Sequence, residues 1–240
     1  TPQKPGAKLL VRTDGSGVGT LGGGCVEGDI WFAAKMLLKD DGPSQVKDYY
    51  LNEEIAAGEG LICGGTMYFL LDRFSDSIEI TPYLREIIAA YNGGEPVALA
   101  SVVKRQQRGK LEVGDKLLVR KDGSSQGSLG EVALERSVIE RAQELMPYGR
   151  CEFLSVEGGG EIFVEAYNTP PQLILMGGGH ISKAISILAE NLGFAIYVID
   201  DRSEFANKER FPSALATIIG PYDKALSQIP VSTNSFIEHN

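Results

Sequence analysis

Two stretches of this chain carry nearly the same sequence at a fixed separation. Residues 6–22 are GAKLLVRTDGSGVGTLG and residues 114–130 are GDKLLVRKDGSSQGSLG, so a shift of 108 gives 12 identities in 17 positions without a gap. A repeat of this quality indicates one structural unit that is present twice. We therefore expect two similarly folded copies that are related by a pseudo-two-fold axis.

Each copy predicts a strand, two turns and a helix, in that order. The strands are residues 8–12 and 116–120, and an Asp-Gly turn follows each of them. In the helix of the first copy, Val26, Ile30 and Leu37 recur at helical spacing, and the second copy repeats the pattern. Both copies are therefore expected to pack a helix on a sheet.

The correspondence continues more weakly toward the end of each copy, where glycine-rich turns lead into the strand-like segments TMYFLLD and EIFVEAY. The apolar residues of 81–92 predict a helix that connects the copies. These elements predict an α+β domain over residues 1–168, with the first repeat at about 5–75 and the second at about 96–167.

An apolar run, PVALASVV at residues 96–103, precedes the second copy and predicts a buried strand. The shift of 108 places its counterpart before residue 1, so the chain is expected to begin inside its own first repeat. At the other end, Phe236 and Ile237 resemble the first residues of a strand, and the carboxyl end is also expected to be incomplete.

Only the first copy carries cysteines in its glycine-rich turns. Cys25 lies in LGGGCVEG and Cys63 in ICGG, whereas the second copy has Ala133 and Gly158 at these places. Glycines let backbone amides approach a ligand, and a helix start favours a thiolate. The pattern therefore suits a thiolate or anion site, although small buried cysteines beside structural turns explain it about equally well. Cys151, in the strand-like CEFLSV, is expected in the core.

Composition restricts the function further. The net charge is −9 and no run of lysine or arginine forms a basic patch, which argues against nucleic acid as a partner. No apolar stretch is long enough to cross a membrane, and a cytoplasmic location is expected. With only His180 and His239 as imidazoles and no CxxC, neither a zinc site nor a Ser-His-Asp triad is indicated. Glu27 is the one carboxylate expected near the cysteine, and it could equally be a helix-dipole partner.

The last third of the chain has the opening pattern of a Rossmann fold. The segment QLILMGGGHISKAISILAENLGFAIYVIDDR predicts strand, glycine turn, helix, strand and acid. Gly177 allows the tight turn, Gly179 allows a phosphate to approach, and the helix from Ile181 to Asn191 presents its N-terminus to the anion. Asp200 follows where a ribose-binding acid is expected. We predict a doubly wound parallel sheet over residues 169–240, after an α+β domain, and hence an α/β protein overall.

The motifs PGAKLLV, LGGGCVEG, CGG, GGGHISKA, IDDRSEF and ERFP together resemble those of the xanthine dehydrogenase accessory proteins, the XdhC/CoxI family. The resemblance implies a non-catalytic, chaperone-like factor that binds molybdenum cofactor, a molybdopterin that some systems use in a dinucleotide form. It also implies that the factor shields the cofactor from oxidation, supports its sulfuration with a cysteine desulfurase, and delivers it to a xanthine dehydrogenase-like molybdoenzyme.

Carried onto this sequence, the family's motifs predict a set of cofactor-binding residues: Gly22, Gly23, Gly24, Cys25, Glu27, Cys63, Gly64, Gly65, Gly177, Gly178, Gly179, His180, Asp200, Asp201 and Arg202. The alternative function is an NAD(P)-dependent oxidoreductase that uses the Rossmann domain for hydride transfer. Against it, His180 is the one clear acid/base candidate. A pseudo-two-fold axis often accompanies a homodimer, and the sequence leaves that state open.

Overall fold

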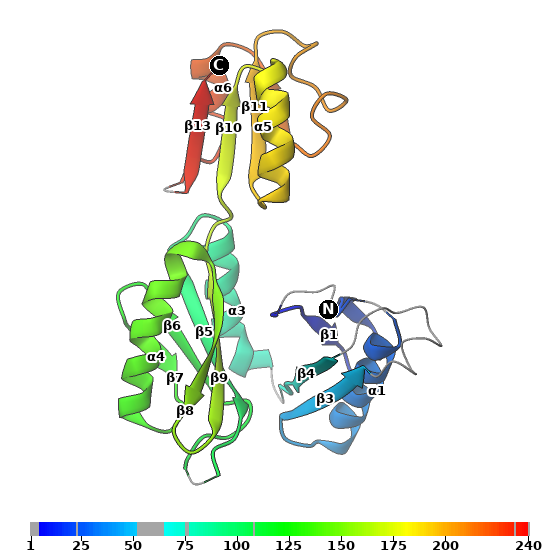
Figure 1. Cartoon of the computed structure of the whole chain (residues 1–240), viewed down its shortest axis with the longest axis vertical. Coiled ribbons are helices and arrows are strands. Elements are labelled where there is room, and N and C mark those ends of the chain that lie inside the picture. The colour runs from blue at the N-terminus through cyan, green and yellow to red at the C-terminus, as the bar shows by residue number, and fades with distance from the viewer. Residues whose placement is uncertain are drawn as a thin grey trace. The chain divides into compact units, whose positions relative to one another are not determined.

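The computed structural model describes residues 5–22, 24–51, 65–74, 77–107, 109–232 and 234–239. Figure 1 traces the chain, which divides into two compact units. The first consists of Thr1–Ile87 with Val97–Tyr167, and the second of Ile88–Pro96 with Asn168–Asn240. The first unit thus contains both copies of the repeat. The second contains the Rossmann-like segment and the end of the connecting helix.

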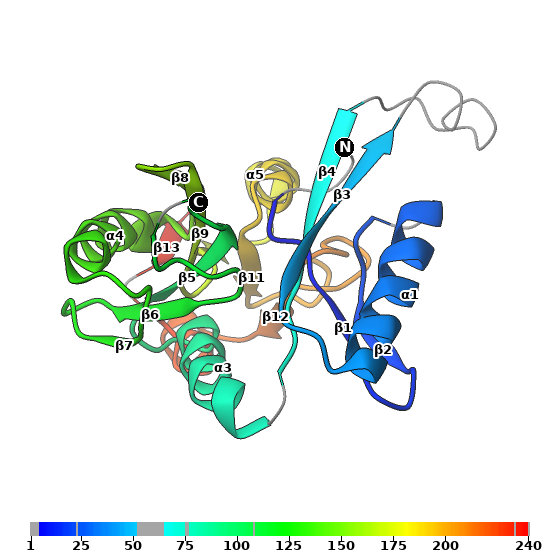
Figure 2. The same cartoon turned by 90° about the horizontal axis from the view of Figure 1, so that it is seen from below.

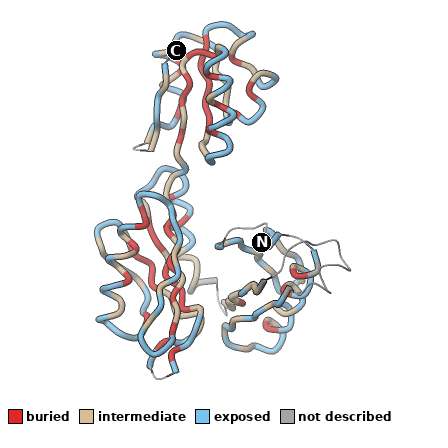
Figure 3. The backbone as a smooth tube through the Cα atoms, viewed as in Figure 1, coloured by how far each residue is buried: buried red, intermediate tan, exposed pale blue. Residues whose placement is uncertain are grey.

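The second copy folds into a five-stranded antiparallel sheet that is covered by one helix. The strands lie in the order β7-β6-β5-β9-β8, and β5 pairs with both β6 and β9 as the central strand. Val138, Ala142 and Leu145 are buried on one face of the helix and pack on the sheet. Figure 3 shows buried positions along the strands of this sheet. The elements are β5 Val97–Lys104, β6 Lys116–Arg120, β7 Ser125–Gly127, α4 Val132–Leu145, a 3-10 turn at Met146–Tyr148, β8 Cys151–Val156 and β9 Gly160–Tyr167.

The first copy has the corresponding elements in the same order, but they form two separate two-stranded sheets. One antiparallel sheet joins β1 to β2 and the other joins β3 to β4 (Figure 2). The helix α1 contacts both β1 and β4, and Val26, Ile30 and Leu37 from this helix build a small core with Leu71. The elements are β1 Leu9–Val11, β2 Gly17–Gly19, α1 Gly24–Asp40, β3 Gln45–Leu51 and β4 Gly65–Leu71.

The two copies share their turn chemistry. Asp14 accepts the backbone N–H of Ser16 at 2.8 Å, and Asp122 accepts that of Ser124 at 2.9 Å. Hydrogen bonds from the side chain and from the backbone N–H of the same serine lower the pKa of each carboxyl. In the same turns, Gly15 and the equivalent glycine of the second copy have φ of +82° and +85°, a region that favours glycine. The repeat in the sequence is therefore also a repeat of backbone conformation.

A pair of reciprocal lysine contacts joins the copies. Lys8 of the first copy binds Glu165 of β9 with an Nζ–Oε1 distance of 2.6 Å. Its equivalent in the second copy, Lys116, binds Asp72 after β4 with an Nζ–Oδ2 distance of 2.6 Å. Each ammonium also lies near an aromatic ring, that of Tyr167 at 5.6 Å for Lys8 and that of Phe74 at 5.3 Å for Lys116. The two lysines are equivalent positions of the repeat, whereas Glu165 and Asp72 are not, so the two ion pairs only approximate a two-fold arrangement.

The second unit contains a parallel, doubly wound sheet with the strand order β12-β11-β10-β13. The helix α5 packs on one face with Leu175 and Val198, and α6 packs on the other with Ile174 and Ile199. The predicted fold class is thereby confirmed. The elements are β10 Gln172–Met176, α5 His180–Asn191, β11 Ala195–Asp200, β12 Ala216–Ile219, α6 Tyr222–Leu226 and β13 Ser235–His239.

The connecting helix α3, Ser77–Tyr91, begins before the predicted residue 81. Proline near a helical pattern signals a helix start, but Pro82 lies inside α3, where a proline removes one backbone donor and crowds the carbonyl one turn earlier. Arg120 of β6 forms a bidentate ion pair with Glu86 of α3, and both N–O distances are 2.6 Å. Among the residues described, no helix is both long and apolar enough to cross a membrane.

Candidate functional site

The amino end of α1 carries the first group of predicted site residues. The helix begins at Gly24, so Cys25 occupies its first turn, where unpaired backbone N–H groups favour a thiolate. Gly24 has φ of +77°, and a Cβ built on it would meet nothing within 4 Å. The second copy has Val132 at this position. The turn before α1 therefore has an open, left-handed backbone that its counterpart does not share.

Glu27 holds this turn together. Its Oε2 accepts hydrogen bonds from the Thr20 hydroxyl at 2.6 Å and from the Leu21 backbone N–H at 2.8 Å. In the second copy, Glu135 accepts the same two bonds from Ser128 and Leu129, each at 2.7 Å. Because the copy without cysteines keeps the arrangement, it accounts for Glu27 as a structural clamp of the turn.

Replacing Glu27 by alanine should therefore destabilise the first copy about as much as Glu135→Ala destabilises the second copy. We expect each change to lower the unfolding free energy by about 1–2 kcal/mol, because each frees a backbone N–H at a helix start. Urea unfolding, monitored by amide exchange in α1 and α4, measures the loss of unfolding free energy in both variants. If the loss of unfolding free energy in Glu27→Ala, but not in Glu135→Ala, became much larger when ligand is present, Glu27 would instead contact the cofactor directly.

Several predicted residues of the first copy cannot be placed. Gly23, Cys63 and Gly64 lie outside the described residues, and of Cys25 only the backbone position in α1 is described. Gly65 begins β4. The prediction that Cys151 lies in the core is wrong, because its side chain is exposed. It occupies the first position of β8, a sheet-edge strand with alternating burial, and alternation alone does not tell which face is covered.

The glycine loop between β10 and α5 has the predicted shape. Gly177 takes a φ of +107° at the tight turn, and its N–H donates to the Ile199 carbonyl at 2.7 Å. A Cβ on Gly178 would lie 2.1 Å from the Phe205 carbonyl oxygen, whereas one on Gly179 would meet nothing within 4 Å. Gly178 is thus required by packing, and the loop is open to a ligand at Gly179, beside the first turn of α5.

Ser182, which takes the place of the third glycine of the Rossmann fingerprint, is fully buried. Its hydroxyl donates back to the Gly177 carbonyl. His180 begins α5 and is exposed. Because serine is small, it permits close packing of the helix. Its hydrogen bond to Gly177 stabilises the turn that precedes it.

Asp200, which was predicted to bind a ribose, is fully buried at the end of β11. Groups of the protein itself donate four hydrogen bonds to its carboxylate. Its carboxylate accepts the Gly178 N–H at 2.8 Å, the Arg202 N–H at 3.0 Å, and the Arg202 Nε and Nη2 groups at 2.9 and 3.1 Å. Burial by itself raises the pKa of Asp200, but the bonds from Arg202 and Gly178 outweigh it and hold that pKa well below its usual range. Asp200 therefore fixes the glycine loop.

Asp201 and Arg202 remain on the surface beside this loop. The side chain of Asp201 is 76% exposed and that of Arg202 is 55% exposed. The Arg202 guanidinium also lies over the Phe205 ring, 4.0 Å from its centroid. Of the predicted acids, Asp201 is the one whose carboxylate faces solvent.

Arg210 is a residue of this site that sequence reasoning did not select. Its Nε donates to the Gly178 carbonyl at 2.7 Å, and its guanidinium lies 5.3 Å from the Phe205 ring. Its Nη2 is buried and has no hydrogen-bond partner among the described residues. A buried donor without an acceptor is rare, and it makes the neighbourhood of the loop suitable for an anion. The ERFP motif, which contains Arg210, is the sequence feature that could have identified this residue.

The strand order places the change of winding direction between β10 and β13. In open parallel sheets, ligands bind at this point beyond the carboxyl ends of the strands. Met176 of β10 pairs here with His239 of β13, whose ring packs edge-to-face on Tyr222 with centroids 5.6 Å apart. The sequence analysis assigned His239 no role in the site, yet β13 brings it beside the end of β10.

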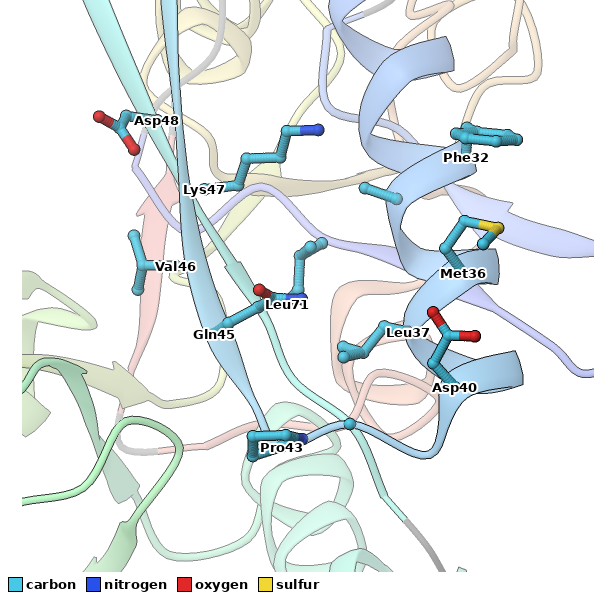
Figure 4. A pocket seen from close by; sticks show the side chains of 12 residues that line it. Phe32, Met36, Leu37, Asp40, Pro43, Gln45, Val46, Lys47, Asp48 and Leu71 are labelled. Carbon is cyan, nitrogen blue, oxygen red and sulfur yellow. The ribbon is translucent and has the colours of Figure 1, made fainter.

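A separate hollow of about 630 Å³ lies between α1 and β3 (Figure 4). Phe32, Met36 and Leu37 line it from the helix, while Gln45 and Lys47 face them from the strand. None of the predicted site residues lines this hollow. We therefore take the amino end of α1 and the glycine loop, rather than this hollow, as the candidate sites. Within the described part of the chain, no cluster of three or more His, Cys, Asp or Glu side chains is arranged to hold a metal ion.

Comparisons with known proteins match most of this chain. The model of the XdhC and CoxI family matches residues 1–49 and 90–157, and that of the XdhC Rossmann domain matches residues 173–235. The chain is 31% identical over 158 residues to the uncharacterized protein YqeB of Escherichia coli (strain K12), covering 59% of this chain and 29% of that protein. It is 25% identical over 228 residues to a probable xanthine dehydrogenase subunit of Bacillus subtilis (strain 168), covering 94% and 63%.

A crystal structure described as a xanthine dehydrogenase from Bacillus halodurans has the same fold. The superposition has a TM-score of 0.61 at 22% identity and covers 99% of this chain and 65% of that one. This chain thus spans less than two thirds of the length of each of these relatives. The family models cover the cysteine-bearing turn, the second copy as far as residue 157, and the glycine loop. From these matches and the motifs they contain, the chain belongs to the XdhC and CoxI family.

Proposed function

We propose that this protein is an accessory factor that binds molybdenum cofactor and delivers it to a xanthine dehydrogenase-like molybdoenzyme, with a cysteine desulfurase as the source of sulfur for the cofactor. The observation that carries the proposal is the open turn at Gly24, which places Cys25 in the first turn of α1 in one copy of the repeat. The second copy keeps the glutamate clamp but has neither the left-handed glycine nor the cysteine.

The chemistry of the two candidate sites suits the parts of this cofactor. Molybdopterin carries a dithiolene, for whose soft metal a thiolate is a suitable neighbour, and a phosphate. The open backbone at Gly179, the first turn of α5 and the unpaired Nη2 of Arg210 together favour an anion. The parallel sheet has the topology at whose switch point nucleotides commonly bind, which supports binding of a dinucleotide form.

The same geometry weighs against the alternative, a nicotinamide-dependent oxidoreductase. A ribose diol is normally held by the acid at the end of the second strand. Here Asp200 accepts four hydrogen bonds from Gly178 and Arg202 and would have to release some of them to bind a diol. We therefore rank cofactor delivery above hydride transfer.

The test is to purify the protein without air from cells that make molybdenum cofactor, and to measure bound molybdenum and oxidised pterin fluorescence. We expect both at a constant ratio to protein, and transfer of the pterin to a cofactor-free molybdoenzyme. Titration with NADH and NADPH, followed by nicotinamide fluorescence, should give no tight binding. Tight nicotinamide binding without retained pterin would overturn the proposal and favour the oxidoreductase.

A further inference from the structure

One face of the hairpin formed by β3 and β4 carries a carboxylate beside two tyrosines. The neighbouring residues Tyr49 and Met67 pack on the small core beneath α1. Because side chains alternate along a strand, Asp48, Tyr50 and Tyr68 lie on the opposite face of the hairpin. Figure 4 shows Asp48 directed away from α1. We call these three residues the tyrosine face.

The strand register brings these three side chains together. Asp48 lies directly opposite Tyr68, and Tyr50 follows Asp48 on the same side of β3. Directly opposed residues have Cβ atoms about 4.5–5.5 Å apart, so one ring lies next to the carboxylate. Tyr50 and Tyr68 are 66% and 71% exposed. Within the described part of the chain, no side-chain hydrogen bond, ion pair or ring contact involves any of the three. Their polar and aromatic groups are therefore available to a ligand.

The second copy has a different arrangement at this place. Tyr68 and Phe163 hold the same position in the matching segments TMYFLLD and EIFVEAY. Phe153 lies opposite Phe163, and the centroids of their rings are 4.7 Å apart. The second copy thus covers its ring with another ring of its own. In the first copy Asp48 stands where the second ring would be, so that a carboxylate and an uncovered ring lie side by side.

A carboxylate beside exposed aromatic rings has a definite chemical complement. Its two oxygens accept two parallel N–H donors, and the rings favour a flat heteroaromatic partner. A 2-amino-4-oxopyrimidine ring is flat and presents such a donor pair at its 2-amino and N3 groups. This ring is one part of every pterin. We propose that the tyrosine face binds the pterin ring of molybdopterin, with Asp48 accepting the donor pair and the ring lying against Tyr50 and Tyr68.

The place of this face in the chain supports the assignment, which rests on the proposed function and adds residues that recognise the ring. Tyr68 follows Cys63 by five residues in the sequence. Molybdopterin carries its dithiolene and its pterin ring in one molecule, so a protein that holds both needs a ring site near its thiolate. None of the cofactor-binding residues predicted from the sequence supplies an aromatic surface for the ring.

The test compares free 6-hydroxymethylpterin with 6-hydroxymethyllumazine, in which an oxo group replaces the 2-amino group. Fluorescence titration of the full chain should show at least about 10-fold tighter binding of the pterin, because the lumazine turns an acceptor toward Asp48. Asp48→Asn should remove or reverse this preference, since an amide donates to the lumazine oxygen. The preference is a ratio measured on one protein, so a partial loss of folded protein does not change it.

Two further variants complete the test. Tyr68→Leu should weaken both ligands by a similar factor of about 10, because it removes stacking and leaves the carboxylate. Asp40→Asn, at an exposed carboxylate in the last turn of α1, is the matched control and should keep the preference. No saturable binding of the pterin, equal affinity for both ligands in the parent, or an unchanged preference in Asp48→Asn overturns the proposal. Guanosine has the same donor pair, and tighter binding of guanosine than of the pterin would also overturn it.

Retention of molybdopterin by protein purified without air separates this inference from the proposed function. The parent should retain more than Asp48→Asn does. If both retain the same amount, the ring site is wrong and the proposed function stands. If the parent retains none, but free pterin binds with a preference that depends on Asp48, the ring site stands and the delivery function is wrong.

Discussion

Protein purified without air should retain at least about 10-fold less molybdopterin when Cys25 is replaced by alanine. Thiolates are suited to soft metals, and the loss of a group that positions a metal site commonly costs about 10- to 100-fold in affinity. We expect the same direction for Cys63→Ala, since both cysteines are exclusive to the first copy. Pterin fluorescence and molybdenum content per protein measure the effect.

Cys151→Ala is the matched control for these variants, because Cys151 is an exposed thiol outside the glycine-rich turns. It should leave pterin retention unchanged. A second control compares amide exchange in α1 between the variant and the parent, so that a loss of pterin is separated from a loss of fold. Full retention in both Cys25→Ala and Cys63→Ala would show that the cysteines do not hold the cofactor.

Replacing Asp200 by alanine should destabilise the second unit by about 3 kcal/mol. The change leaves the Gly178 N–H without its acceptor and removes the buried partner of Arg202. The urea dependence of amide exchange in β10 and β11 measures the loss within this unit. The neighbouring change Asp201→Ala, at an exposed carboxylate, is the matched control and should cost less than about 0.5 kcal/mol.

The same carboxylate predicts a dependence on pH. Because the pKa of Asp200 is lower in the folded protein than in the unfolded chain, its ionised form stabilises the fold at every pH above the unfolded value of about 3.9. That contribution is lost as the pH falls below this value toward the folded pKa. Parent protein should therefore lose stability more steeply below about pH 4 than Asp200→Ala does. Parallel curves for the two proteins would contradict the assigned role.

Much of the fold could be predicted because it depends on local sequence. The strand at residues 116–120 and the helix that ends at Asn191 lie where turn residues and apolar spacing place them. The strand begun at Phe236 was also predicted, and it is β13. Each of these signals is contained in a few adjacent residues. Such patterns do not depend on what packs against them.

Contacts between distant residues could not be predicted in this way. Arg210 reaches the Gly178 carbonyl across 32 positions, and Gly178 is required by Phe205 rather than by a ligand. The saturation of Asp200 likewise depends on the conformation of Arg202, which a motif does not specify. Glu27 is different, since its role could have been inferred by noticing that the copy without cysteines keeps Glu135.

The reciprocal lysine contacts have a consequence for the strength that the interface between the copies needs. Two separate proteins would have to associate from dilute solution, whereas two copies on one chain meet at an effective concentration on the order of millimolar. Lys8 is 61% exposed, so its ion pair with Glu165 contributes little by itself, whereas Lys116 is only 11% exposed. On one polypeptide, contacts that would be too few to hold separate proteins together can be enough, so the two halves can diverge in sequence and still meet.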